Sequence, residues 1–210
     1  TEANEANITF RLYNNTGLVN SSIWTNGQRT INWTGLSDGV YTFNVTVLDS
    51  VGNQNTTSTR NVIIDKTIPL IQYESQTDAD GIIAVRSSII INVSASDTNL
   101  RNITVNLYNL TGLVNSSTTT TSPNYVNFSG LANGVYYFNA SVYDYAGNVN
   151  NTATRNATLD THIPGIQFMS PTENNGVNKS QRFILINVSA SDTNLRNITV
   201  NLYNLTGLVN

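Results

Sequence analysis

The sequence predicts an all-β protein built from antiparallel β-sandwiches that repeat every 95 residues along the chain. Three observations support this fold class: the repeat itself, short stretches in which apolar and polar residues alternate, and turn-forming residues between these stretches. No window of the sequence shows sustained helical periodicity. Several short strands in about 95 residues are typical of a sandwich of two antiparallel sheets.

The repeat is clearest in a 25-residue segment that occurs twice without change. Ile91–Asn115 and Ile186–Asn210 both read INVSASDTNLRNITVNLYNLTGLVN, at an offset of 95 residues. The same offset aligns Gly39–Tyr41 with Gly134–Tyr136, and no gap is needed anywhere. The chain of 210 residues therefore holds two periods and the beginning of a third.

Each period contains stretches with the two-residue alternation of half-buried strands. Apolar side chains take every second position in residues 89–95, 103–107 and 136–142, and many of them are β-branched or aromatic. Turn-forming residues follow or separate these stretches, at Asp97–Asn99, Asn133–Gly134 and Ala146–Asn148. We therefore expect short strands joined by tight turns.

Two motifs in each period resemble those of immunoglobulin-like repeats from bacteria and archaea. The segments that end in Tyr41 and Tyr136 resemble the L-x-x-G-x-Y tyrosine corner of immunoglobulin-like sandwiches. Asp49–Asn53 and Asp144–Asn148 resemble the D-x-A-G-N hairpin of the prokaryotic repeats. The resemblance implies tandem immunoglobulin-like antiparallel β-sandwiches, with each corner tyrosine hydroxyl bonded to nearby backbone. Members of this family are mostly stalks, adhesins, and surface-layer or filament proteins.

The predicted domain boundaries follow from the segments between repeats. Asp65–Pro69 resembles the D-x-T-x-P junction of such repeats, and Asp160–Pro164 departs from this pattern at His162. The predicted divisions are residues 1–68 as the C-terminal part of one repeat, residues 69–163 as a complete repeat, and residues 164–210 as the N-terminal part of the next. Half a sandwich leaves strand edges and half a core exposed. We expect either a polypeptide that continues in both directions or a neighbouring subunit that donates the missing strands.

The composition argues against several classes of function. Charged residues make up 11% of the chain and the net charge is −3, so there is no basic footprint for nucleic acid. There is no cysteine, and the single histidine makes Ser-His or multi-histidine metal chemistry unexpected. No apolar run reaches the roughly 18 residues of a membrane span, and no secretory leader pattern opens the chain. We expect a protein that is not an enzyme.

Asparagine is the unusual residue of this composition, with 34 among 210 positions. The Asn-x-Ser/Thr acceptor pattern for N-glycosylation occurs 18 times, whereas chance placement would give about eight. We predict N-linked glycans at many of these positions. The acceptor asparagines are Asn7, Asn14, Asn20, Asn32, Asn44, Asn55, Asn92, Asn102, Asn109, Asn115, Asn127, Asn139, Asn150, Asn156, Asn178, Asn187, Asn197 and Asn204.

Several acceptor patterns match the period of a strand. In segments such as Asn92–Ser94, Asn102–Thr104 and Asn139–Ser141, the first and third side chains share one face while the small or branched apolar residue between them points the other way. The same residues can therefore form a strand and present a glycan acceptor to solvent. The alternative is that a secreted β protein with few charges is rich in Asn, Ser and Thr for solubility alone.

The remaining candidate sites are weaker. Aspartates recur as three pairs at the repeat offset: Asp49 and Asp144, Asp65 and Asp160, and Asp97 and Asp192. We expect no cofactor, although calcium at a domain junction is possible because this cation takes several oxygen ligands; the alternative is that these aspartates hold turns. His162 takes the place of Thr67 in the previous repeat, so we interpret it as ordinary surface.

The prediction for function is a structural extracellular protein that forms a heavily N-glycosylated cell-surface filament, fibre or stalk. Its partners would be copies of itself, arranged head to tail or as one continuous repeat chain. The density of acceptor sites suggests an archaeal surface. The alternatives are a spacer beside an enzyme domain, or an adhesin or carbohydrate-binding module that uses an aromatic platform or contact face. The candidate aromatics are Trp24, Trp33, Tyr73, Tyr108, Tyr137, Tyr143 and Tyr145.

Overall fold

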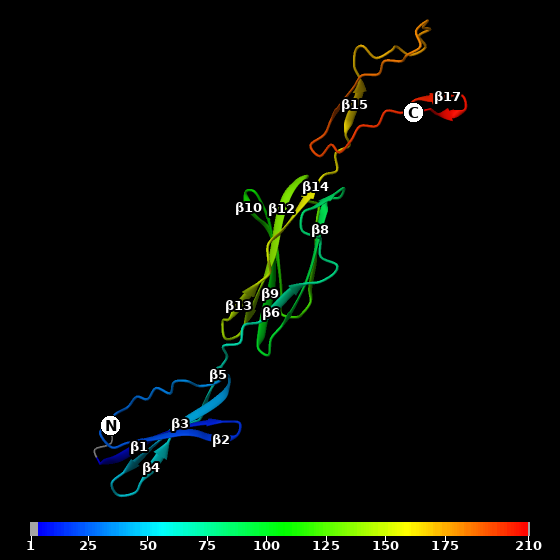
Figure 1. Cartoon of the computed structure of the whole chain (residues 1–210). Coiled ribbons are helices and arrows are strands. Elements are labelled where there is room, and N and C mark those ends of the chain that lie inside the picture. The colour runs from blue at the N-terminus through cyan, green and yellow to red at the C-terminus, as the bar shows by residue number, and fades with distance from the viewer. Residues whose placement is uncertain (1–3, 210) are drawn as a thin grey trace.

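The computed structural model describes residues 4–209 and shows domains that follow one another end to end in an elongated molecule (Figure 1). Every regular element in this range is a β-strand. The described residues contain no helix that could cross a membrane. The blue-to-cyan N-terminal part and the orange-to-red C-terminal part lie at opposite ends of the green-to-yellow central domain.

The central domain is a sandwich of two sheets, which confirms the predicted fold class. One sheet has the order β10-β9-β12-β14-β7, with β13 also paired to β12, and the other has the order β11-β8-β6. The pairs are antiparallel except for the parallel pair of β14 and β7. The strands are β6 (Leu70–Tyr73), β7 (Ile82–Ala84), β8 (Ser88–Ser96), β9 (Leu100–Asn109), β10 (Gly112–Thr119), β11 (Asn124–Ser129), β12 (Gly134–Asp144), β13 (Val149–Asn151) and β14 (Arg155–Leu159).

The core of the central domain lies between these two sheets. Alternate residues of β8, β9 and β12 are fully buried, as the two-residue alternation predicts. Burying each large apolar side chain contributes about 1.5–3 kcal/mol, and this packing holds the two sheets together. The buried residues of these three strands include Ile89, Ile91, Val93, Ile103, Val105, Leu107, Phe138, Ala140 and Val142.

The N-terminal domain contains one sheet, in the order β2-β1-β3-β4 with β5 also paired to β3. These strands are the repeats of β10, β9, β12, β13 and β14. Within residues 4–68, no second sheet covers this one, and residues 29–34, the repeat of β11, form no strand. The strands are β1 (Glu5–Asn14), β2 (Gly17–Trp24), β3 (Gly39–Asp49), β4 (Gln54–Thr56) and β5 (Arg60–Ile64).

The C-terminal part shows what a strand sequence does without its partners. Residues 195–202 are identical in sequence to residues 100–107 of β9, but they form no strand. In the central domain β9 pairs with β10 and β12, and residues 164–209 contain no repeat of β12. Only short pairs remain, β15 (Gly165–Phe168) with β16 (Val188–Ser191) and β17 (Tyr203–Asn204) with β18 (Gly207–Leu208).

The corner tyrosines tie the start of a long strand to the preceding loop. The hydroxyl of Tyr136 donates a hydrogen bond to the carbonyl oxygen of Ala132 at 3.1 Å, and that of Tyr41 donates to Ser37 at the same distance. Both rings are buried, with exposed fractions of 7% and 6%. The bond fixes the loop that leads into β12 and into β3.

We expect Tyr136→Phe to lower the free energy of unfolding of the central domain by about 0.5–1.5 kcal/mol, because one intramolecular hydrogen bond to a carbonyl is lost. Urea denaturation followed by circular dichroism measures this change. Tyr137→Phe is the control, because it removes a hydroxyl from the neighbouring residue on the outer face of β12. Equal effects of the two substitutions would contradict the role of the corner bond.

Candidate functional site

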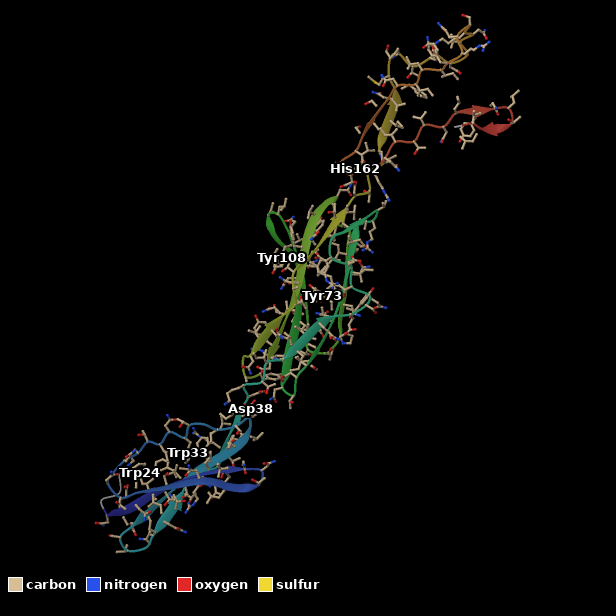
Figure 2. All side chains as sticks on the ribbon, viewed as in Figure 1. Trp24, Trp33, Asp38, Tyr73, Tyr108 and His162 are labelled. Carbon is tan, nitrogen blue, oxygen red and sulfur yellow. The ribbon has the colours of Figure 1, made fainter. Side chains whose placement is uncertain are left out.

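Recurrent polar residues meet at the junction between the N-terminal and central domains, near the Asp38 label in Figure 2. Three segments form this junction: the linker 65–69 between β5 and β6, the loop 97–99 between β8 and β9, and the hairpin 144–148 between β12 and β13. The repeat therefore places the same polar residue types at each domain boundary. The junction is the candidate functional site because it determines how one domain follows the next.

The hairpin is built around the buried carboxylate of Asp144. Its two oxygens accept hydrogen bonds from the backbone amide of Asn148 at 2.8 Å and from the Nδ2 of Asn148 at 2.7 Å. Gly147 has φ of +95°, a backbone conformation that glycine adopts most easily. Asp49 makes the same two bonds with Asn53, at 2.7 and 2.8 Å, in the hairpin of the N-terminal domain. The D-x-x-G-N sequence thus closes the turn through its own side chains.

Hydrogen bonds determine the ionisation of these carboxylates. Burial alone would raise the pKa of Asp144, but the bonds from Asn148 and from the amides of Gly147 and Ala146 outweigh it and lower the pKa. The side-chain bond from Asn53 is the main reason that the pKa of Asp49 is lowered. Both hairpins therefore favour the ionised carboxylate.

Side-chain amides of the central domain hold the linker from the N-terminal domain. Asn99 donates through Nδ2 to the carboxylate of Asp65 at 2.6 Å, and Asn148 donates through Nδ2 to the Asp65 carbonyl oxygen at 3.1 Å. Asn150 donates to the carbonyl oxygen of Pro69 at 2.9 Å. The loop, the hairpin and β13 therefore each contact the linker, and together they restrict its direction. We call Asn99, Asn148 and Asn150 the junction clamp.

The second junction repeats part of this arrangement. Asn194 donates through Nδ2 to the carboxylate of Asp160 at 2.6 Å, as Asn99 does to Asp65. This bond is the main cause of the lowered pKa of Asp160. The side chain of His162 is 80% exposed, and its Nδ1 lies 2.9 Å from the Nδ2 of Asn133. The histidine is thus a surface residue of the linker.

Three carboxylates of the first junction lie close enough to share a cation. Oxygens of Asp65, Asp97 and Asp144 lie within 4.8 Å of one another, and such oxygens are the ligands that calcium takes. Each carboxylate also accepts a hydrogen bond from an amide, including the backbone amide of Asn99 to Asp97 at 2.6 Å. The cluster could hold a hard cation, and at least one oxygen of each carboxylate already accepts a hydrogen bond from an amide.

We expect the protein to lose thermal stability as the pH falls below about 4, because the carboxylates with lowered pKa stabilise the fold only while ionised. Asp49, Asp144 and Asp160 each have a pKa below the ordinary value of 3.8. Their contribution is present above that pH and is lost as the pH falls through the lower folded-state values. Melting temperature measured against pH tests this expectation. In Asp144→Asn, the melting temperature of the central domain should fall less steeply at low pH. An unchanged dependence on pH would contradict our interpretation.

The 18 acceptor asparagines all lie within the described residues, and none of them is buried. In the central domain the strand patterns alternate as predicted: Val93, Ile103, Ala140 and Ala157 point into the core between half-exposed neighbours. Several acceptor side chains already have structural partners through Nδ2, the atom that would carry a glycan. The bond from Asn150 to the linker is the clearest case.

Three acceptor asparagines form a repeated geometry at the tips of hairpins. Oδ1 of Asn109 accepts hydrogen bonds from the amide and the hydroxyl of Thr111, at 2.8 and 2.7 Å. Asn14 and Asn204 make the corresponding bonds to their own threonines. Because both bonds go to Oδ1, neither engages Nδ2. These positions combine an ordered acceptor side chain with an accessible loop.

The aromatic residues do not form one exposed platform. Tyr73 packs its ring edge-on against Phe138, with ring centroids 5.9 Å apart, and Arg155 lies 4.1 Å from the Tyr73 centroid. Its hydroxyl donates to the carbonyl oxygen of Ala153 at 2.8 Å, and burial raises its pKa. The suggestion that Tyr73 belongs to a sugar-stacking surface is therefore wrong. Tyr145 remains well exposed, at 76%.

Sequence reasoning missed the role of Asn99 and Asn148 in the junction clamp. The available signal was their recurrence, since Asn4, Asn99 and Asn194 share one repeat position. Neither Asn99 nor Asn148 begins an acceptor pattern, so the N-glycosylation motif does not mark them. Their role depends on the fold, which brings the loop of Asn99 and the hairpin of Asn148 together at Asp65 in the linker.

The fold and the repeated junction define a tandem immunoglobulin-like protein. Residues 5–66 and 74–161 match the bacterial Ig-like domain family, and the chain belongs to that family. Domains of this family are usually found on surface or extracellular proteins, are typical of surface proteins or spacers, and are generally not enzymes.

Solved structures with fibronectin-III-like or immunoglobulin-like domains resemble this chain. The fibronectin(III)-like modules of Clostridium thermocellum CbhA share 16% identity, with 76% of this chain and 80% of that chain covered and a TM-score of 0.43. Dimeric latent PorU from Porphyromonas gingivalis shares 15% identity over 77% of this chain and 17% of that one, with a TM-score of 0.35. Chicken CNTN1 FN1-FN3 domains share 12% identity over 74% and 56%, with a TM-score of 0.35. None of the curated proteins compared matches the sequence.

Proposed function

We propose that this protein is a structural, non-enzymatic component of an extracellular stalk, fibre or filament whose surface carries N-linked glycans. The observation that supports it most is the junction, where Asn99, Asn148 and Asn150 hold the linker between successive domains. A clamped linker keeps successive domains extended, and near-identical units in one line set length by copy number. The partners are copies of the same unit, in one chain or head to tail.

Glycans would suit this surface for two physical reasons. Charged residues make up only 11% of the chain, so hydration depends on neutral polar groups. Edge strands are also open to pairing with other molecules, and the exposed acceptors Asn20 and Asn115 lie on the edge strands β2 and β10. A bulky glycan at either position would block edge-to-edge pairing. The density of acceptors is our reason for proposing an archaeal surface.

Intact mass and glycopeptide mapping of the native protein test the glycan part of this proposal. We expect a mass above the 22.9 kDa of the polypeptide, with glycan on the hairpin-tip residues Asn14 and Asn109. Asn150 is the internal control, since its Nδ2 is bonded to the linker. A mass equal to that of the polypeptide would remove the glycans from the proposal.

Asn99→Ala tests the proposal that the junction clamp keeps successive domains extended. We expect the angle between the N-terminal and central domains to vary more widely, because the bond to Asp65 is lost. Distance distributions between spin labels on the two domains measure this spread. Asn106→Ala is the matched control, because Asn106 lies on the outer face of β9 away from the linker. A spread that is the same in both variants would contradict a clamping role.

A second candidate function is an adhesin that uses exposed tyrosines. Tyr143 and Tyr145 are 40% and 76% exposed next to the first junction, and aromatic side chains are enriched at binding interfaces. A glycan array probed with the wild-type protein and with Tyr145→Ser would distinguish the two functions. Binding that depends on Tyr145 would favour the adhesin.

A further inference from the structure

The outer face of the sheet β11-β8-β6 in the central domain carries two acceptor asparagines next to two apolar side chains. Strands β8 and β11 pair so that Asn127 lies opposite Ile90 and Tyr125 lies opposite Asn92. Each acceptor therefore has one apolar residue across from it on the neighbouring strand and another two residues before it on its own strand. We call Ile90, Asn92, Tyr125 and Asn127 the outer-face square.

The side chains of the outer-face square lie on the solvent side of the sheet. The alternate residues of β8 and β11 point the other way, and Ile91 and Phe128 among them are buried in the core. Tyr125 is 53% exposed, and its hydroxyl makes no hydrogen bond to the residues that the structure describes. The apolar surface of this ring is therefore open to contact with another apolar group.

The two acceptor asparagines of the square have their Nδ2 atoms available for a glycan. Neither Nδ2 donates a hydrogen bond within the described part of the chain, whereas the Nδ2 of Asn150 does. The Oδ1 of Asn92 is buried without a hydrogen-bond partner, so this carboxamide lies close against the sheet. A sugar attached to such a side chain begins at the level of the neighbouring side chains.

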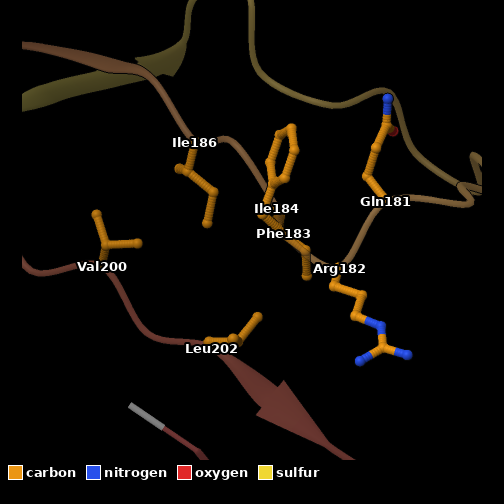
Figure 3. Close-up of a pocket in the computed structure, with 7 residues that line it drawn as sticks. All are labelled: Gln181, Arg182, Phe183, Ile184, Ile186, Val200 and Leu202. Atoms are coloured by element: carbon orange, nitrogen blue, oxygen red, sulfur yellow. The ribbon is translucent and has the colours of Figure 1, made fainter.

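The third copy of this segment keeps the alternation between an acceptor face and an inward apolar face. Figure 3 shows Ile184 and Ile186 lining a pocket in the C-terminal part. Leu185 lies between them in the sequence, at the repeat position of Ile90, and is 44% exposed. Because Leu185 stands two residues before the acceptor Asn187, an apolar residue again precedes the acceptor.

The other sheet of the central domain pairs an acceptor with a tyrosine in a similar way. Asn102 on β9 lies opposite Tyr143 on β12, on the outer face of the sheet. Tyr143 is 40% exposed. A partly exposed tyrosine next to an acceptor asparagine therefore occurs on both sheets of this domain.

The spacing of side chains on a sheet places these apolar residues within reach of the first sugar of a glycan. Residues opposite each other on paired strands have Cβ atoms about 4.5–5.5 Å apart, and residues two apart on one strand are separated by about 7 Å. One face of a pyranose ring presents mainly C–H groups, whereas the face of an aromatic ring is electron-rich. Stacking the two faces removes apolar surface from water and brings opposite partial charges together.

We propose that Tyr125 and Ile90 form a binding surface for the first sugar of the glycan on Asn127. The ring of Tyr125 stacks on the apolar face of this sugar from the same strand, and Ile90 contacts it from β8. Strand β11 lies at the edge of its sheet, so a glycan held against it shields that edge from pairing with other molecules. This inference rests on the proposed glycosylation, and it names the residues that position the sugar.

Nuclear magnetic resonance of the native glycoprotein tests the contact directly. Asn92→Gln removes the other acceptor next to Tyr125, so that only the glycan on Asn127 adjoins this ring. We expect the C–H protons of its first sugar to resonate upfield of their positions in the glycopeptide released by proteolysis, because they lie over the tyrosine ring. Tyr125→Thr should abolish this upfield shift. Tyr145→Thr is the control and should keep it, because it removes an exposed tyrosine from the hairpin 144–148.

Folding stability gives a second measurement of the same contact. Tyr125→Thr should lower the equilibrium constant for folding about threefold more in the protein with a glycan on Asn127 than in Asn127→Gln, because only the first loses apolar area covered by the sugar. Urea denaturation of the four proteins completes this double-mutant cycle.

Glycopeptide mapping separates the failure of this inference from the failure of the proposed glycosylation. A glycan on Asn127 without the upfield shift, or equal losses of stability in the two backgrounds, would overturn the contact and leave the glycosylated surface in place. An unmodified Asn127 beside other occupied acceptors would also overturn the contact alone. A native protein without glycan at any acceptor would overturn both.

Discussion

Hydrogen exchange is expected to distinguish the two copies of the identical 25-residue segment by about a thousandfold or more, because one copy lies in a complete sandwich and the other does not. Amides in residues 100–107 belong to the central strand β9, which is paired on both sides. Amides in residues 195–202 have the same sequence but form no strand. Intrinsic exchange depends on local sequence, so the difference measures tertiary context alone.

The measurement needs a way to tell the copies apart. Peptides that lie wholly inside the segment have the same mass, and the two residues before each copy add equal masses because leucine and isoleucine are isobaric. Peptides that begin at or before Ser88 and Phe183 differ in mass. Similar protection in both copies would mean that this sequence forms its strands without the sheets that cover it in the central domain, and our account of the C-terminal part would be wrong.

The sequence predicted the strands of the central domain well because its alternation matches the burial of a two-layer sandwich. The residues that alternate in 89–95, 103–107 and 136–142 are those that become buried between the sheets. The D-x-x-G-N hairpin was also predictable, since its aspartate, glycine and asparagine act within one turn. Both signals are local in sequence.

Features that depend on distant partners could not be predicted in this way. Residues 29–34 repeat β11 in sequence but remain without a strand, because no repeat of β8 pairs with them in the N-terminal domain. The junction clamp joins Asn99 and Asn148 to Asp65, which is 34 residues away from the first and 83 from the second. An amide side chain carries no sign of such a partner until the fold brings them together.

Ile91→Ala is expected to destabilise the central domain by about 2–5 kcal/mol, the range for truncating a fully buried isoleucine. Ile186→Ala changes the identical position of the C-terminal copy. It should leave the stability of the central domain unchanged, because the Ile186 side chain lies outside the core of that domain. Urea denaturation followed by circular dichroism measures both, and a lower midpoint with the same slope would assign the change to stability. Trp24 and Trp33 both lie in the N-terminal domain, so tryptophan fluorescence monitors that domain separately. Equal losses of stability from the two substitutions would contradict the role of β8 in the core of the central domain. A loss confined to Ile91→Ala would show that this segment stabilises the protein through burial by partner strands. The Ile-x-Ile-x-Val sequence alone would then not be sufficient.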